Sequence, residues 1–364
     1  MFRKIRKLFN RPNIFFRDAL LNKYPLHLTQ GVTHFGGENI IIDACENIDN
    51  QFIPDFDIDV VYTWVSDLDL QWKNKRDTYS HLWDGHTTPH ALEKSRFDDH
   101  NEIYYSLLSL EMYMPWVRNI YIITDSQIPP TPIGIREKVH IVDHRDIIPE
   151  KYLPTFNSHV IEACLHNIND LSEHFIYFND DFFVAREISA AHFFHSNEIA
   201  SIFIGNKNIN FEHDKLTSTS IACKNSNDLF LEMFDITFNH NLVHTYVPLR
   251  KSYYILAYDI FGERILNFLT NKFRSTTDIN MATFFVPYLQ YIYGVSTPKI
   301  DISYYFNIRS PTASFYYDRL LDAKAGNNLP HSFCANDFSS CEFPYANCHD
   351  EFNKFAQKFY DYFN

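Results

Sequence analysis

Three polar side chains of the kind that bind metal ions interrupt an apolar stretch in the middle of the chain. Phe175 to Phe178 are typical of a buried strand, and Asn179, Asp180 and Asp181 follow them directly. Two adjacent carboxylates in an apolar neighbourhood repel each other and lose hydration unless a cation or hydrogen-bond donors compensate them. Because Mg²⁺ binds one or two carboxylates together with substrate phosphates, this stretch predicts a metal–nucleotide site. A turn in which these side chains cap backbone donors is the alternative.

A second group of chemically capable residues comprises His244, Arg250 and Lys251, an imidazole and two cations in one short stretch. A single histidine usually has a structural role. A histidine near cations that can reach a phosphate is a better candidate for a general base, because its unperturbed pKa lies near neutrality. Arg96 could likewise reach a phosphate or pair with acidic side chains, and Asn101 falls in the first turn of the helix that follows it.

Four apolar segments that read as strands each end in a carboxylate residue. They are residues 57–65, 119–124, 138–142 and 175–178, ending at Asp67, Asp125, Asp143 and Asp180. Segments with helical periodicity, at 98–113 and 157–168, separate several of them. Strands buried on both faces that alternate with helices predict an α/β fold with a mostly parallel sheet and flanking helices, followed by a helical C-terminal portion. Since ligands bind beyond the carboxyl ends of such strands, we expect an acidic edge that holds a metal and a phosphorylated ligand.

The composition is that of a globular protein with a substantial core. Of 364 residues, 45% are hydrophobic and 17% aromatic, while only 9 are glycine, which excludes disordered and collagen-like classes. The net charge of −13 argues against nucleic acid as a partner. Walker, G-x-G-x-x-G, G-x-S-x-G and H-E-x-x-H motifs are absent, so any phosphate must be bound by metal, arginine and histidine.

The first 24 residues have the opposite charge to the rest of the chain. Their local balance is +6, from seven basic residues and one acidic residue, with aromatic and aliphatic residues interleaved. Such a basic amphipathic segment suits the anionic inner face of a membrane, although it could equally pack on the acidic body of the protein itself. No apolar run is long enough for a spanning helix or a secretory signal. We expect a basic, membrane-proximal arm and lead-in at 1–56, a catalytic α/β domain at 57–337 with a helical insertion at about 237–294, and a C-terminal helix at 338–364.

Several segments together resemble the Stealth family. They are Asp59-Val-Val-Tyr-Thr-Trp-Val65, Arg96-Phe-Asp-Asp-His-Asn-Glu102 through Pro115-Trp-Val-Arg-Asn-Ile-Tyr-Ile-Ile-Thr-Asp125, and Leu153-Pro-Thr-Phe-Asn-Ser-His159 through Phe178-Asn-Asp-Asp181. The resemblance runs from about residue 57 to 337, with a third block from His244 to Gly294 and a fourth from Cys334 to Asp337. The family includes bacterial capsular-polysaccharide sugar-phosphate transferases and the catalytic subunit of the lysosomal-enzyme N-acetylglucosamine-1-phosphotransferase. Its core is similar to the nucleotide-sugar fold of A-type glycosyltransferases.

The resemblance implies transfer of an N-acetylhexosamine 1-phosphate from a UDP-sugar to a hydroxyl of a capsular oligosaccharide, with release of UMP. It also implies functional residues at Asp59, Asp180, Asp181, His244, Arg274, Asn336 and Asp337. From the residue chemistry we expect as catalytic residues His244, Arg274, Asp181 and Asp59; as metal ligands for Mg²⁺ or Mn²⁺ Asp180, Asp181, Asn336 and Asp337; and as substrate-binding residues Thr63, Trp64, Arg96, Asn101, Asn157, Arg250 and Lys251.

Two other functions remain open at this level. A metal-dependent glycosyltransferase with the same metal site would release UDP, and a non-catalytic subunit of a capsule assembly complex would bind sugars without turnover. Because the chain is compact and no spanning helix or secretory signal is predicted, we expect a bacterial cytoplasmic protein that associates peripherally with the inner membrane or with the capsule assembly machinery.

Overall fold

The structure, a computed structural model, describes residues 8, 12, 15, 16, 44–81, 87–92, 97, 99–209, 211, 216–326, 328–337 and 347–361. Arg96 and most of the basic N-terminal segment therefore lie outside the described residues. Within the described part of the chain, no helix is both long and apolar enough to cross a bilayer.

The main sheet has five strands in the order β3-β2-β1-β4-β9. These are β1 (Ile58–Thr63), β2 (Ile120–Thr124), β3 (Val139–Asp143), β4 (His174–Asn179) and β9 (Val247–Arg250). The first four pair in parallel, with Val60 opposite Ile120 and Thr63 opposite Asn179. β9 joins the edge of β4 in the antiparallel direction. The expected mostly parallel α/β fold is confirmed.

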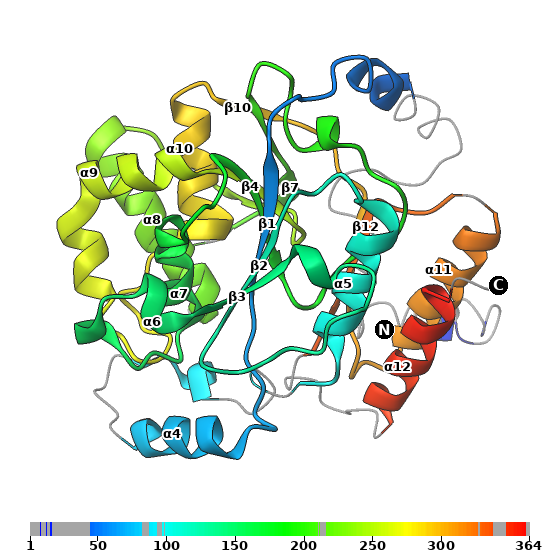
Figure 1. The fold of residues 1–364 in the computed structure, drawn as a ribbon, viewed down its shortest axis with the longest axis horizontal. Helices are drawn as coiled ribbons and strands as arrows, with labels where there is room; N and C mark the ends of the chain where they lie inside the picture. The colour runs from blue at the N-terminus through cyan, green and yellow to red at the C-terminus, as the bar shows by residue number, and fades with distance from the viewer. Residues whose placement is uncertain are drawn as a thin grey trace.

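Helices cover both faces of this sheet, because successive residues of each strand point to opposite sides and both sides are apolar. The helices labelled in Figure 1 are α4 (Leu70–Ser80), α5 (Glu102–Tyr113), α6 (His144–Ile147), α7 (Ser158–Ala163), α8 (Ser218–Phe234), α9 (Lys251–Phe268), α10 (Val286–Ile292), α11 (Ala313–Ala325) and α12 (Cys348–Phe359). Val61 packs in the core on the side of α7 to α10, whereas Val60 and Tyr62 pack against α5. In Figure 1, α8 to α10 lie on one side of the sheet and α11 and α12 on the other.

A second sheet of three strands, in the order β11-β12-β5, lies beside the main sheet. It consists of β5 (Phe182–Val184), β11 (Ser303–Asn307) and β12 (Ser332–Asn336). Residues of α11 and α12 share its apolar core. Asp180 and Asp181 form the short turn between β4 and β5, so they occupy the connection between the two sheets.

Two short two-stranded sheets complete the architecture. They pair β6 (Ala200–Ile202) with β10 (Ser296–Pro298), and β7 (Ile204–Asn208) with β8 (His240–Leu242). The helical region begins earlier than the expected insertion at about 237–294, because α8 starts at Ser218, and it is not purely helical, because β9 within it belongs to the main sheet.

Candidate active site

A cavity of about 590 Å³ lies at the carboxyl ends of β1 and β4, where sequence analysis placed a ligand site. We call it the Asp180 cavity. It is lined by residues from many stretches of the chain that are distant in sequence, among them Thr63 and Trp64, Ser158 and Glu162, Asn179 to Asp181, Thr217 to Ser220, Asn241 to Thr245, Arg274, and Ala335 to Asp337. The fold therefore brings together most of the residues that the sequence motifs singled out.

Asp181 is held in place by the end of β12. The Asn336 amide donates a hydrogen bond to Asp181 Oδ2 at 2.8 Å, and the Cys334 thiol donates to the same oxygen at 3.2 Å. The backbone N–H of Ala335 donates to the carbonyl oxygen of Asp181 at 3.2 Å. Because both side-chain donors use Oδ2, these contacts leave Oδ1 of Asp181 for a ligand. The predicted partnership of Asp181 with Asn336 is thus visible as a direct contact.

The electrostatics of the cavity suit a cation. Burial, the Asp181 carboxylate and the Asp99 carboxylate together raise the pKa of Asp180 to about 8. Burial and the charge of Asp180 likewise raise the pKa of Glu102, which lines the same cavity. Oxygen ligands that destabilise one another in this way fit a hard divalent ion such as Mg²⁺ or Mn²⁺, which would favour their charged forms.

His244 lies beside the acid pair and is a neutral imidazole near pH 7. Burial lowers its pKa, and the nearby Asp181 charge offsets only part of this effect. Its ring meets Phe182 and Tyr305 edge-on, with centroid distances of 4.9 and 5.3 Å. A ligand atom of His244 lies within 4.8 Å of those of Asp181 and Cys334. His244 is therefore able to accept a proton next to the acid pair.

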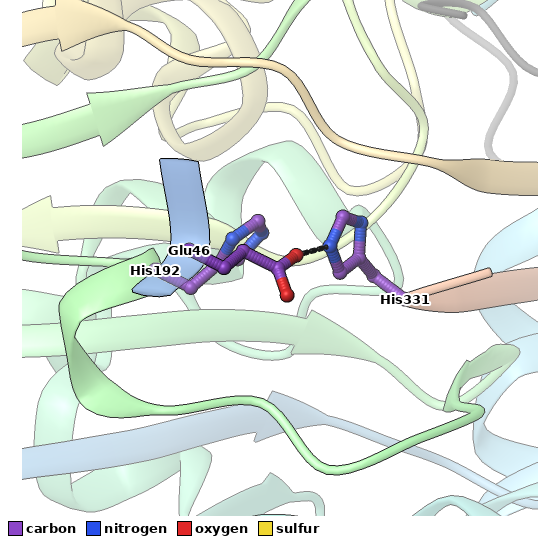
Figure 2. Close-up of side chains that lie close together, drawn as sticks. All are labelled: Glu46, His192 and His331. Atoms are coloured by element: carbon purple, nitrogen blue, oxygen red, sulfur yellow. Dashed lines mark hydrogen bonds and ion pairs between the residues drawn. The ribbon is translucent and has the colours of Figure 1, made fainter. Parts of the chain in front are cut away.

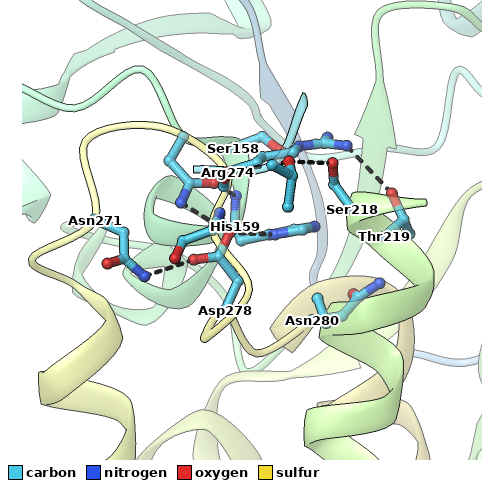
Figure 3. A network of polar contacts seen from close by, with 12 residues as sticks. Ser158, His159, Ser218, Thr219, Asn271, Arg274, Asp278 and Asn280 are labelled. Atoms are coloured by element: carbon cyan, nitrogen blue, oxygen red, sulfur yellow. Dashed lines mark hydrogen bonds and ion pairs between the residues drawn. The ribbon is translucent and has the colours of Figure 1, made fainter. Parts of the chain in front are cut away.

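Arg274 lies at the N-terminus of α8 (Figure 3). Its guanidinium donates to Ser158 Oγ at 2.8 Å and to Thr219 Oγ1 at 3.2 Å. The first backbone N–H groups of this 17-residue helix, whose N-cap is Thr217, carry a partial positive charge. A fixed guanidinium beside a helix N-terminus that bears hydroxyl groups is suited to bind phosphate oxygens.

The loop that carries Arg274 is fixed by the fully buried Asp278 (Figure 3). One carboxylate oxygen of Asp278 contacts the Asn157 amide and His159 Nδ1, both at 2.9 Å, and accepts from the backbone N–H of Ser275 at 3.0 Å. Its other oxygen accepts from Asn271 at 2.8 Å. The network explains Asn157, which was expected to bind substrate: its side chain is fully buried and supports the Arg274 loop instead.

Three other expected site residues lie away from the cavity. Asp59, expected to be catalytic, is fully buried near the amino end of β1, where it pairs with Arg118 at 2.6 Å. Arg250 is opposite His174, at the far end of β4, and pairs with Glu173. Lys251 donates to the carbonyl oxygen of Ile168. The antiparallel direction of β9 carries both cations away from His244.

The remaining predicted residues are divided between structural and site positions. Thr63 lines the Asp180 cavity, and its hydroxyl is hydrogen-bonded to Tyr177 at 2.9 Å. Trp64 lines this cavity and a second one, which Asn101 also lines. Asp337 lines the Asp180 cavity, but its carboxylate is salt-bridged to Arg309 and lies 3.1 Å from His349 Nε2, so it is a weaker candidate for a metal ligand than Asp180 or Asp181.

Of the four strand-end carboxylates that were expected to form an acidic edge, Asp180 lines the Asp180 cavity and the other three do not. Asp125 pairs with Lys75 at 2.6 Å, Asp143 caps α6 and binds Arg145, and Asp67 lies 4.0 Å from Lys73. These three carboxylates have structural partners, and none of them lines the Asp180 cavity. Among the described residues, only Asp180 and Asp181, after β4, contribute carboxylates from a main-sheet strand end to it.

Sequence reasoning missed Ser158, Glu162, Thr219 and Tyr305 as residues of the cavity. Burial raises the pKa of Glu162, although His159 and Arg274 partly counter this. The available signal was the hydroxyl-rich stretch Thr217-Ser-Thr-Ser220, which has the composition of a helix N-terminus. Glu102 stood in a first helical turn, where an acidic residue is ordinary.

A second cluster of ionisable groups, Glu46, His192 and His331, has ligand atoms within 4.8 Å of one another (Figure 2). Its groups pair internally. Glu46 binds Arg186 at 2.7 Å and His331 Nε2, and Asp301 Oδ1 lies 2.9 Å from His192 Nε2 and 3.2 Å from His331 Nδ1. The cluster attaches residues 44–49 to the body of the protein, outside the Asp180 cavity.

Comparison with known proteins finds relatives that align with more than nine tenths of the chain. The model of Stealth protein conserved region 2 matches residues 96–202. The capsular polysaccharide phosphotransferase LcbA of Aeromonas hydrophila is 47% identical over 343 residues, covering 93% of this chain and 94% of its own. The capsular polysaccharide phosphotransferase fcs1 of Haemophilus influenzae is 44% identical over 370 residues, covering 98% and 100%.

Among solved structures, the galactosyltransferase LgtC in complex with donor and acceptor sugar analogues has a TM-score of 0.38 at 11% identity, covering 82% of this chain and 95% of its own. The strand order described above, and not this similarity, is the basis of the fold assignment. With relatives 44 to 47% identical over more than nine tenths of its length, the chain belongs to the Stealth family, together with these capsular polysaccharide phosphotransferases.

Proposed function

We propose that the protein is a capsular polysaccharide phosphotransferase that moves an N-acetylhexosamine 1-phosphate from a UDP-sugar to a hydroxyl group of a capsular glycan. The acceptor oxygen would bond to the β-phosphorus, the bond from that phosphorus to the α-phosphate oxygen would break, and UMP would leave. The relatives named as capsular polysaccharide phosphotransferases support the reaction class.

The proposal rests mainly on one observation: acidic side chains and anion-binding groups line the same cavity. Asp180 and Asp181 line it together with Arg274 and the N-terminus of α8. Transfer of a phosphoryl group requires mainly positioning and neutralisation of charge, and these groups offer a cation site and two anion-binding elements in the same space. A diphosphate is the ligand that uses both.

Each residue then has a role. His244, neutral because it is buried, accepts the proton of the acceptor hydroxyl. Arg274 and the N–H groups at the start of α8 bind oxygens of the diphosphate. Asp180 and Asp181, with Asn336 supporting Asp181, would hold Mg²⁺ or Mn²⁺, whose charge would neutralise the diphosphate. Thr63 and Trp64 lie at the wall where the nucleoside would enter.

The experiment is to incubate the protein with UDP-N-acetylglucosamine and its 2- and 4-epimers, Mg²⁺ and a capsular oligosaccharide, and to identify the released nucleotide. We expect UMP from one donor, its loss with EDTA and its return with added Mg²⁺ or Mn²⁺. Release of UDP would identify a glycosyltransferase, which breaks the bond on the sugar side of the phosphate. Binding of donor without release of any nucleotide would identify a non-catalytic subunit.

A further inference from the structure

A second cavity, of about 660 Å³, adjoins the Asp180 cavity. We call it the Gln127 cavity. Trp64 lines both cavities, and His100 Nε2, in the wall of the Gln127 cavity, lies 3.6 Å from Asp337 Oδ2, in the wall of the other. Single side chains therefore separate the two spaces. The volume falls within the range of small-molecule sites in proteins.

The Gln127 cavity is preformed. Gln127 is buried, and its side-chain amide accepts from the backbone N–H of Ser66 at 2.9 Å and donates to the carbonyl oxygen of Ser66 at 2.7 Å. These two bonds join the segment after β2 to the segment after β1 and fix the two sides of the cavity relative to each other. A preformed cavity binds its ligand without the cost of ordering a loop.

The lining chemistry differs from that of the Asp180 cavity. The Gln127 cavity has the Trp64 indole, the amides of Asn101 and Asn353, and the carboxylates of Asp69 and Asp99. Among the described residues that line it there is no lysine or arginine. A phosphate would meet two negative charges with no lysine or arginine among the described lining residues to offset them, whereas a neutral ligand rich in hydroxyl groups can donate to the carboxylates and exchange hydrogen bonds with the amides.

The rim of the cavity is apolar and open to solvent. Leu68 and Ile128 line it, and they are 74% and 86% exposed. Exposed aliphatic side chains beside a tryptophan form a surface for the C–H faces of sugar rings, which are themselves apolar. A glycan could leave the cavity over this rim.

We propose that the Gln127 cavity binds a neutral sugar residue of the acceptor glycan and so delivers the adjacent hydroxyl group to His244 and the Asp180 cavity. This inference rests on the proposed function, because it assigns the second substrate of the same reaction. The two substrates bind in different cavities because they differ in charge. The anionic donor binds beside Arg274 and the α8 N-terminus, and the uncharged part of the acceptor binds beside carboxylates and amides.

The test uses the full chain and the variant Ile128→Glu, with Ile133→Glu as a matched control. Ile133 is 85% exposed and does not line the cavity, so the two substitutions change charge and exposed apolar area equally. We expect Ile128→Glu to raise the KM for the oligosaccharide roughly fivefold or more, the effect of losing part of one apolar contact. The KM for the UDP-sugar, and UMP release without acceptor, should stay within about twofold of the wild type.

An unchanged oligosaccharide KM in Ile128→Glu would overturn the inference, and a raised donor KM would assign the cavity to the donor instead. A second pair on α12 probes the opposite wall: Asn353→Trp, which fills the cavity, against Lys354→Trp, an exposed neighbour outside it. Calorimetric binding of a neutral capsular oligosaccharide to these proteins needs no turnover. Binding lost only in Asn353→Trp supports the inference even if the wild type releases no nucleotide, an outcome that would defeat the proposed function alone.

Discussion

At the level of single residues, the proposed metal ligands Asp180 and Asp181 destabilise each other when no cation is bound. Burial and mutual repulsion raise the pKa of Asp180 to about 8, so without a cation the charged pair destabilises the fold. We predict that Asp180→Asn lowers turnover by roughly 100-fold or more while the midpoint of thermal unfolding, measured without metal near pH 8, stays equal or rises. Turnover assays and differential scanning calorimetry check this.

Asp59→Asn is the informative contrast to Asp180→Asn. The fully buried Asp59 pairs with the partly exposed Arg118 and accepts from the backbone N–H groups of Asn119 and Ser172, so the substitution removes a charge partner of Arg118 and leaves buried backbone donors poorly matched. We predict a loss of about 2–4 kcal/mol in unfolding free energy, with turnover per folded molecule close to wild type. A loss of turnover without a loss of stability would return Asp59 to the catalytic residues.

Arg274 and Arg250 give a second matched comparison. Arg274→Lys keeps the charge but loses the planar fork that binds Ser158 and Thr219 together, so we expect kcat/KM for the donor to fall roughly tenfold or more. Arg250→Lys, whose side chain pairs with Glu173 and Glu198 away from the cavity, should change it by less than about twofold. Steady-state measurements of kcat/KM for the donor check this. Equal effects of the two substitutions would contradict the phosphate-binding role of Arg274.

At the level of elements, His331 attaches residues 44–49 to the body of the protein. Burial alone would lower the pKa of His331, but hydrogen bonds to Asp301 and Glu46 outweigh it and raise the pKa. Burial would raise the pKa of Glu46, but His331 and Arg186 lower it to about 2. His192 and Tyr246 also face this cluster, through Asp301. The contact between His331 Nε2 and Glu46 is therefore strengthened when His331 is protonated and Glu46 is ionised, whereas His331 Nδ1 also accepts from the backbone N–H of Ile302 at 2.9 Å.

The sign of the resulting pH dependence follows from these shifts. The raised folded-state pKa of His331 means that its contribution is complete below the unfolded value of about 6.5 and is lost as pH rises through the folded value. The Glu46 contribution is complete above about 4.5 and is lost as pH falls toward 2. We predict that wild type exceeds His331→Gln in unfolding free energy by about 1–3 kcal/mol near pH 5.5, and that the gap narrows with rising pH.

Denaturant titrations of the two proteins at a series of pH values measure this gap. His140→Gln is the control, because His140 is exposed and its side-chain partner is Asn119, outside the cluster of Glu46, His192 and His331. A gap between wild type and His331→Gln that stays constant from pH 5.5 to pH 9 would show that His331 acts through packing and not through its charge.

Among the elements, the parallel strands could be predicted from sequence because each is an apolar segment followed by polar residues. The function of those polar residues could not be predicted from sequence. Asp125 and Asp143 stand at strand ends as Asp180 does, but their partners, Lys75 and Arg145, appear only once the helices are placed. Likewise, the position of His244 relative to Arg250 depends on the direction of β9, which residue spacing does not encode.

For the whole molecule, sequence motifs identified the acid pair, His244 and Arg274, which line one cavity although they are far apart in the chain. They did not identify Ser158, Thr219 or Tyr305, because hydroxyl groups are common in loops and helix caps and mark a site only when tertiary packing gathers them. Nor did they reveal Asp278, whose importance lies in the contacts that it makes within the Arg274 loop.

The charge distribution along the chain leads to a prediction about membranes. Residues 1–24 have a net charge of +6, whereas the whole chain has −13. We predict that the protein co-sediments with vesicles containing anionic lipid, that about 0.5 M salt abolishes this binding by screening, and that a variant lacking residues 1–24 does not bind. Equal binding to neutral vesicles, or unchanged binding of the shortened variant, would contradict an electrostatic membrane contact.

The central claim is that the β-phosphate of the donor is transferred together with the sugar. The most direct measurement follows radioactive phosphorus placed at the β-phosphate of the UDP-N-acetylhexosamine that supports turnover. The account predicts that the label enters the glycan and resists phosphatase, as a phosphodiester does, while UMP is released unlabelled. Label recovered in UDP, with an unlabelled glycan product, would contradict it.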